Sequence, residues 1–501
     1  MQLFRTKSLE AIQSDVGEEG AEGADASVGH LRKRLSARHL IGFGIGVVIG
    51  TGIFTLTGIQ ARETAGPAVV ISFAIAGIVA LLAALCYAEL ASSVPTAGSA
   101  YSYAYATTGE LLAWVIGWDL FLEFAFGAAV VARGWSAYIG NLLDLPTSLF
   151  GEDATVNVGA AFIVVVLTLV AVLGIKESAR VTNVLVVVKV AICVFVVVTG
   201  IWFVKGANLT PFIPAGKPTE GADGLAQPLI SLIAGLDPAT FGVGGVLTAA
   251  AVVFFAYTGF EAVANLSEET RKPSRDVPLG LLGTLGVATA LYIGVAFVVV
   301  GMVKYTDIDA GAPIADAFDQ VGLGWASSLI SIAAVAGLTS VILVDLVTVS
   351  RIGFAMGRDG LLPQSIAKVS PRTGAPVRMT LLYAALVLGI ATFFPLSALA
   401  NLVSIGTLFA FVLVSVAVPV LRRTRPDLPR AFRVPFSPVV PVLSALACFY
   451  LMLNLEVETW LRFLAWLVIG LGIYGLYGHR HSRLRNEPQD QGTQQAAVTS
   501  D

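Results

Sequence analysis

Two long apolar segments of this chain are interrupted by small and polar residues. The first begins near His39 and reads IGTGIF over residues 49–54, and the second begins near Gly242 and reads YTGFE over residues 257–261. A backbone group that leaves a helix within lipid costs several kcal/mol, so such a break survives only where it lines a cavity inside the protein. Paired breaks in two halves of a chain are typical of a binding site near the membrane midplane.

The composition places the chain in a membrane. Of its 501 residues, 56% are hydrophobic and 13% are charged, with a mean hydropathy of +0.81, beyond the range of soluble domains. We predict an all-α integral membrane protein with twelve transmembrane helices. The net charge of −3 indicates no nucleic-acid partner. The expected spans are 39–61, 67–92, 110–139, 156–175, 180–204, 243–266, 279–303, 325–350, 377–395, 398–421, 438–454 and 459–478.

Lysine and arginine are distributed unevenly among the loops. With the N-terminus inside, 24 of the 31 lie on the cytosolic side and five on the other face. Positive charge accumulates on the cytosolic side of membrane proteins, so we expect a multi-pass protein of the cytoplasmic membrane with both termini in the cytosol. The acidic N-terminal stretch has no apolar core of a cleavable signal peptide.

The two breaks fall in spans 1 and 6. Five spans separate Gly52 from Gly259, and an odd number of spans turns the second copy upside down, which predicts a 5+5 inverted repeat. Spans 11 and 12 are then additional. The expected division is 1-35 as a disordered acidic cytosolic arm, 36-204 as the first five-helix repeat, 205-241 as an extracytoplasmic loop, 242-421 as the second inverted repeat, 422-478 as a cytosolic loop with helices 11 and 12, and 479-501 as a disordered cytosolic tail.

Four stretches resemble signatures of one transporter group. Residues 44–58 (GIGVVIGTGIFTLTG) resemble the first-helix signature of the amino acid–polyamine–organocation (APC) superfamily, and residues 254–280 resemble the sixth-helix and loop signature of its cationic amino acid transporter (CAT) subfamily. Residues 356–363 (MGRDGLLP) and 403–408 (VSIGTL) match later signatures. The resemblance implies a bacterial twelve-span permease with a LeuT-like fold and broken helices 1 and 6, and no enzyme activity.

The two breaks offer groups for both ends of an amino acid. A helix that restarts at mid-membrane presents free N–H groups at the positive end of its dipole. In span 1 these are the amides of Gly50, Thr51 and Gly52, which suit a carboxylate. Carbonyl groups freed at the breaks suit the ammonium, and the resemblance implies the same division of roles. For the span 1 glycines that are spaced four apart, helix packing is the alternative. The carbonyls are those of Val48, Phe255, Ala256 and Thr258.

Lys189 lies nine residues into span 5, too deep for its side chain to reach the interface easily. A buried lysine can lose and regain a proton near neutral pH. In sodium-coupled relatives of this fold, a metal ion lies near this place, and the resemblance implies that the ammonium replaces it. The coupling ion is then H⁺, and no cofactor or metal is expected. The alternative is a structural tie between span 5 and span 1.

Charged residues within spans cost about 2.5–3.5 kcal/mol and are functional by default. Glu123 lies in the middle of span 3, and the resemblance implies that it faces the substrate; a structural carboxylate is the alternative. Glu261 is expected to cap the second break, and Glu89 and Asp345 to anchor loops or form gates near the cytosolic ends of spans 2 and 8. The expected substrate-binding residues are Val48, Gly50, Thr51, Gly52, Glu123, Phe255, Ala256, Thr258 and Gly259, with Lys189 as the proton-coupling residue.

These features together favour a secondary active carrier that imports amino acids by proton-coupled symport and alternating access. An amino acid or polyamine exchanger of the same superfamily is the main alternative, and a channel or receptor is a weaker one. A membrane enzyme would need a catalytic constellation, which the sequence does not offer. The expected partners are a small-molecule amino acid, H⁺ and membrane lipid. Both cationic and small neutral amino acids fit the sequence.

Overall fold

The computed structural model describes residues 35–93, 101, 105, 109–152, 154–173, 179–218, 224–266, 270–368, 370, 376–424, 426 and 430–483. Nearly all of them are helical, and the strands among them are β1 (Lys217–Pro218) and β2 (Ala239–Thr240), which pair antiparallel in a loop. The predicted acidic arm, except Leu35, and the tail beyond Arg483 lie outside the described residues.

Eight helical segments are long and apolar enough to cross a membrane, and four apolar helices of 10–17 residues accompany them in the described part of the chain. The protein is therefore a multi-pass membrane protein. The principal helices are α2 (Ala37–Val48), α3 (Thr51–Phe54), α4 (Leu56–Gln60), α5 (Val69–Ser93), α7 (Glu110–Leu143), α9 (Val158–Val172), α10 (Ala179–Gly200), α12 (Gly242–Val253), α13 (Pro273–Met302), α15 (Gly324–Arg358), α16 (Val377–Phe393), α17 (Leu396–Thr424), α18 (Val439–Leu453) and α19 (Val457–Ile473).

Short helices complete the structure at the ends of the bundle and at the second break. The α-helical ones are α8 (Thr147–Phe150), α11 (Leu229–Ala234), α14 (Pro313–Gln320) and α20 (His479–His481). The 3-10 and π segments are η2 (Ala61–Ala65), η3 (Gly66–Ala68), η4 (Ile201–Phe203), η5 (Gly206–Leu209), η6 (Gly224–Ala226), η7 (Phe254–Tyr257), η8 (Phe260–Leu266), η9 (Tyr305–Asp307) and η10 (Tyr474–Gly478).

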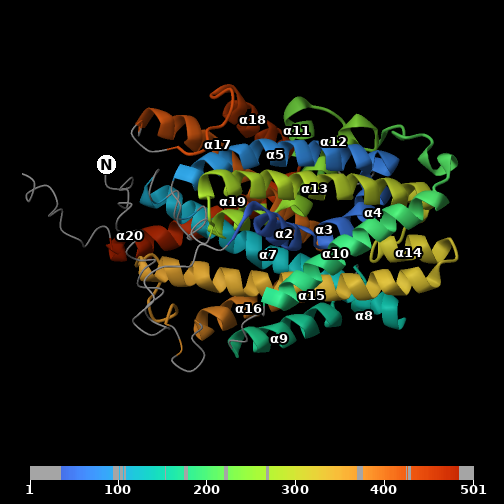
Figure 1. Ribbon diagram of the computed structural model, residues 1–501, viewed down its shortest axis with the longest axis horizontal. Coiled ribbons are helices and arrows are strands. Elements are labelled where there is room, and N and C mark those ends of the chain that lie inside the picture. Colours follow the sequence, from blue (N-terminus) through green and yellow to red (C-terminus); the bar gives the residue numbers. More distant parts are fainter. Residues whose placement is uncertain are drawn as a thin grey trace, which may run out of the picture.

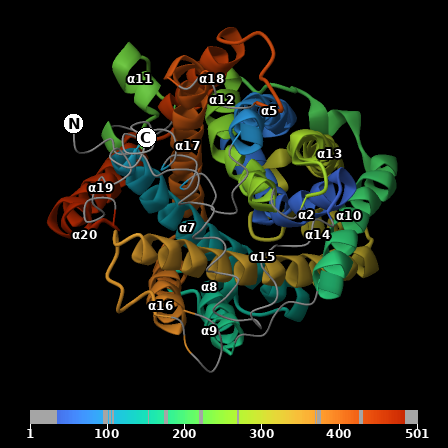
Figure 2. The same ribbon diagram turned by 60° about the vertical axis from the view of Figure 1, so that its left-hand side comes forward.

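The long helices run side by side along the long axis of the molecule, with α20 at one end and α14 at the other (Figure 1). Two packed groups are visible in the contacts and in the turned view (Figure 2): α7 packs on α15, α16 and α9, while α13 packs on α5 and α2. Many leucine, valine and phenylalanine side chains, such as Phe162, Leu169 and Val187, are exposed on the outer faces. Helices that are apolar on every face are typical of membrane spans.

A buried ion pair joins the ends of α5 and α17 at the α20 end of the molecule. Both carboxylate oxygens of Glu89 accept hydrogen bonds from Arg422, at 2.8 Å from Nε and 2.6 Å from Nη2, and the amide of Val434 donates to Oε2 at 2.7 Å. The Arg430 Nε lies 3.6 Å from Glu89 Oε1. Glu89 therefore anchors the loop after α17, which is one of the two roles expected for it.

Replacing Glu89 by glutamine should destabilise the fold, because it leaves the buried Arg422 contact without its charge partner. We expect the free energy of unfolding to fall by about 2–3 kcal/mol. This is less than the cost of breaking a fully buried ion pair, because Arg422 is partly exposed. The melting temperature of the purified protein in detergent measures this loss. Glu458→Gln is the matched control, because the Glu458–Arg462 pair is exposed and is worth about 0.5 kcal/mol or less. Equal melting temperatures for the two variants would contradict the assigned role of Glu89.

Candidate functional site

The first break separates α2 from α3. The last hydrogen bond of α2 runs from the amide of Ile49 to the carbonyl of Ile45, and Gly50 then adopts an extended conformation (φ −144°, ψ −152°) before α3 begins at Thr51. Within the described part of the chain, the amides of Gly50, Thr51 and Gly52 donate to no protein group. The buried hydroxyl of Thr51 also lacks a partner there. The break thus presents four free donors.

The second break lies between α12 and η8. The α-helix tightens into η7, Thr258 is extended, and Gly259 has φ +90°, a conformation that L side chains rarely adopt. The amide of Gly259 donates to Glu261 Oε1 at 3.1 Å, which confirms the expected capping by Glu261. The carbonyl of Phe255 accepts the amide and the hydroxyl of Thr258, at 3.1 and 2.8 Å.

The two breaks lie directly against each other. A β-carbon on Gly52 would collide with the backbone of Ala256, so only glycine permits this approach. The hydroxyl of Tyr292, on α13, lies 2.8 Å from the carbonyl oxygen of Val48 and 2.9 Å from that of Ala256. The hydroxyl proton of Tyr292 is therefore shared between one carbonyl of each broken helix, and Tyr292 connects the two breaks.

This arrangement changes the expected ammonium site. Of the four carbonyls named from the sequence, Val48 and Ala256 already accept from Tyr292, and Phe255 is used by the turn at Thr258. Thr258 is the one of the four whose carbonyl accepts no hydrogen bond among the described residues. Tyr292 could not be found from the sequence, because a hydrogen bond across helices leaves no periodic pattern.

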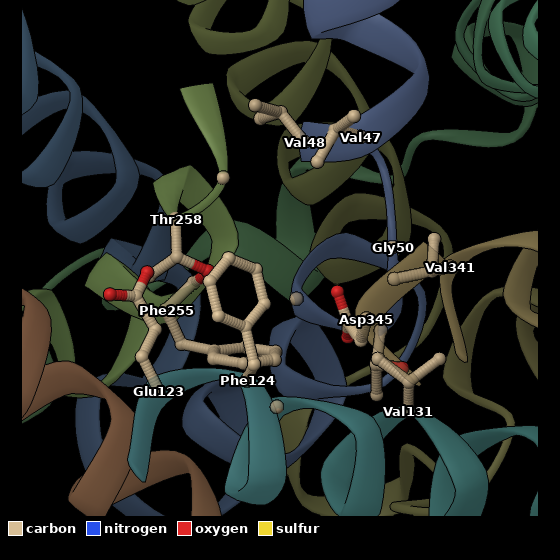
Figure 3. Close-up of a pocket in the computed structure, with 14 residues that line it drawn as sticks. Val47, Val48, Gly50, Glu123, Phe124, Val131, Phe255, Thr258, Val341 and Asp345 are labelled. Carbon is tan, nitrogen blue, oxygen red and sulfur yellow. The ribbon is translucent and has the colours of Figure 1, made fainter. Parts of the chain in front are cut away.

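A small cavity of about 40 Å³ lies between the two breaks, α7 and α15 (Figure 3). Eight of the nine residues expected to bind substrate line it, and Ala256 packs behind Gly52 instead. Four further apolar lining residues with side chains of valine size or larger, which were not expected from the sequence, are Val47, Phe124, Val131 and Val341. Ligand pockets usually enclose about 300 Å³ or more, so this cavity must widen to admit a solute.

Asp345 also lines this cavity, which corrects its expected place near a loop. In Figure 3, Glu123 and Thr258 lie on one side of the cavity, and Asp345 lies with Val341 on the other. The cavity therefore has free amides at the first break and two carboxyl groups on its walls. Such an arrangement can hold a ligand that carries both an acidic group and hydrogen-bond donors.

Lys189 reaches the back of the first broken helix. Its side chain is 1% exposed, and Nζ donates to the carbonyl oxygen of Gly46 at 2.8 Å. A β-carbon on Gly337 of α15 would lie 2.9 Å from Lys189 Cε. Lys189 therefore lies at the junction of α2, α10 and α15 and outside the cavity itself. Gly46 packs on Val186 of α10, whereas nothing lies within 4 Å of a β-carbon on Gly42.

Comparison with known proteins identifies the family. A family model described as amino acid permease matches residues 35–474. The chain is 43% identical to the methylthioribose transporter of Bacillus subtilis (strain 168), over 96% of this chain and 99% of that protein. It is 42% identical to the branched-chain amino acid permease BcaP of the same bacterium, over 96% and 99% of the two chains.

A plant relative supports the same assignment. The cationic amino acid transporter 4, vacuolar, of Arabidopsis thaliana is 39% identical over 79% of this chain and 64% of that protein. These matches agree with the resemblance seen in the sequence. The chain therefore belongs to the amino acid permease family of the APC superfamily, and it is a membrane transporter rather than an enzyme.

Proposed function

We propose that the protein imports amino acids across the cytoplasmic membrane by proton-coupled symport, with alternating access to the cavity between the two broken helices. The observation that carries this proposal is the set of free donors at the first break. The amides of Gly50, Thr51 and Gly52 can receive a substrate carboxylate, which a helix N-terminus favours. Thr258, whose carbonyl accepts no hydrogen bond among the described residues, and Glu123 both line the cavity and are the proposed partners of the ammonium.

Several features support twelve spans in a LeuT-like 5+5 arrangement. Each of the twelve expected spans overlaps one of the eight long apolar segments or the four shorter apolar helices, and the two breaks fall in the expected spans 1 and 6. The excess of lysine and arginine near the α20 end favours a cytosolic location for that end and for both termini. The exposed aliphatic faces then contact lipid.

The helix contacts support a rocking mechanism. One packed group contains α2, α5 and α13, and the other contains α7, α9, α15 and α16. The site lies between these groups, so their relative movement would open it to one side at a time. At the α14 end a polar cavity of about 550 Å³ is lined by Arg62, Asp144 and Asp309, among others. It lies about 15 Å from the central cavity along α7, and we assign it as the outer entrance.

Lys189 is the proposed proton-coupling residue, because its ammonium holds the first broken helix against α10 and α15. Loss of the proton would weaken the hydrogen bond to the Gly46 carbonyl and release α2. An exchanger of the same superfamily is the alternative. It would carry amino acids without a proton gradient, provided that substrate were present on the opposite side.

Substrate candidates follow from the relatives. The names of the relatives specify branched-chain amino acids, cationic amino acids and methylthioribose. Methylthioribose lacks the carboxylate that the free amides suit, so amino acids are the first candidates. The 43% identity to the methylthioribose transporter keeps this thiosugar as a second candidate. Uptake of each radiolabelled compound into proteoliposomes, with an inward proton gradient, tests the proposal directly.

Substitution of Lys189 should uncouple transport from the proton gradient. In proteoliposomes, Lys189→Ala should lose accumulation driven by an imposed pH gradient, because no group then exchanges a proton beside the first broken helix. Lys205→Ala is the control, since Lys205 is an exposed residue outside the spans and should behave like the wild type. Gradient-driven accumulation by Lys189→Ala at the wild-type rate would exclude this residue as the coupling site.

Gly50 offers a clean test of the carboxylate site. A methyl group there would meet only Val341, at 3.9 Å, so Gly50→Ala should fold normally and cover part of the free amides. We expect KM for the transported amino acid to rise about tenfold, the worth of one hydrogen bond to a charged group. Gly42→Ala, on the preceding helix α2 and with open space around it, should leave KM unchanged. Equal KM values for the two variants would place the carboxylate elsewhere.

A further inference from the structure

Asp345 is a buried carboxylate that faces the central cavity without a partner. It is 7% exposed, and neither a hydrogen bond nor an ion pair to its side chain occurs among the described residues. A β-carbon added to Gly127 of α7 would lie 3.7 Å from Asp345 Oδ2, so the carboxylate lies close to α7. By contrast, the buried carboxylates of Glu89 and Glu110 accept hydrogen bonds from side chains of other helices.

None of the described groups around Asp345 donates a hydrogen bond to its side chain or forms an ion pair with it. The charged neighbours are Lys189 from α10 and Glu261 from the second break, and Tyr383 of α16 also faces it. Glu123 is on the opposite side of the same cavity. The ammonium of Lys189 donates to the Gly46 carbonyl. Tyr383 directs its hydroxyl to the carbonyl of Phe121.

An unpartnered carboxylate in the membrane interior is destabilising by several kcal/mol. A protein gains from such a group when a ligand supplies the missing hydrogen-bond donors, because sites built around a buried polar group strongly reject ligands that leave it unpaired. A proton could also neutralise Asp345, but it would not use the room beside the side chain, whereas a ligand in the cavity can reach the carboxylate and donate to it. The direction of the side chain into the cavity favours the ligand.

We propose that Asp345 determines specificity by accepting hydrogen bonds from a donor on the substrate side chain, either a cationic nitrogen or a hydroxyl. The free amides of Gly50 and Thr51 would hold the carboxylate of an amino acid, and Asp345 would meet the far part of the molecule. Aliphatic side chains would leave Asp345 unpaired and would therefore be poorer substrates. This inference rests on the proposed function, since it requires that a solute occupy this cavity.

The test compares uptake of L-arginine, L-serine and L-leucine by proteoliposomes that contain the wild type, Asp345→Asn or Asp345→Leu. The wild type should transport at least one of the two donor-bearing amino acids with a higher kcat/KM than leucine. Asp345→Asn should lower kcat/KM for that substrate by about 10-fold to 100-fold, the worth of a hydrogen bond to a charged group, with much less effect on leucine. Asp345→Leu should reverse the preference. Asp319→Asn, an exposed residue at the α14 end, is the matched control.

The outcomes separate the two proposals. If the wild type accumulates none of the amino acids, the proposed function fails. If it accumulates them but prefers leucine, or if Asp345→Asn lowers uptake of all substrates equally, the specificity role is wrong. A loss of gradient dependence with unchanged preference would assign Asp345 to proton transfer instead. Because a variant could fail to fold, the wild type is also examined by thermal shift, and equal stabilisation by arginine, serine and leucine would overturn the inference as well.

Discussion

The structure depends on one constraint, which is that backbone polar groups within a membrane must find partners in the protein. Breaking a helix at mid-membrane exposes such groups. Here the two breaks lie against each other, so that backbone groups of both can bond to the same side chain. Tyr292 bridges the carbonyls of Val48 and Ala256, and the contact between Gly52 and Ala256 excludes other atoms from between the helices. The carbonyls of Val48 and Ala256 thereby share one donor, whereas that of Thr258 accepts no hydrogen bond among the described residues.

The amide side is not satisfied, and this asymmetry gives the cavity its chemical character. Free N–H groups and the Thr51 hydroxyl remain at the start of α3, where the helix dipole is positive. The opposite walls carry Glu123 and Asp345. Elsewhere in the described interior, Arg133 donates to four carbonyls, whereas both carboxyl oxygens of the buried Asp119 lack a hydrogen-bond partner. The free amides of the first break and the unpartnered carboxylate of Asp345 therefore lie at the same cavity, where a solute can complete them.

The sequence was sufficient to locate the breaks, because clustered glycine and threonine within an apolar run weaken a continuous helix. It was also sufficient to place Glu123 and the glycines of span 1 at one site, through the family resemblance. It failed for Asp345, because the expected span ended at residue 350. The helix α15 instead continues to Arg358, which puts about 20 Å of helix between Asp345 and that end. A hydropathy pattern marks where the membrane ends, and a helix can extend well beyond it.

The state of the carbonyl groups was equally inaccessible from the sequence. The Phe255 carbonyl is not free, because the amide and the hydroxyl of Thr258 donate to it in a turn. This turn is followed by Gly259, which has a positive φ. Such local competition is decided by geometry rather than by residue type. For the proposed site, this favours side-chain carboxylates over backbone carbonyls as the groups that would bind an ammonium. A site that holds an amino group through side chains can change its substrate by single substitutions, whereas the proposed carboxylate site, made of backbone amides, would stay the same. The different substrates named for relatives of 39–43% identity fit this division.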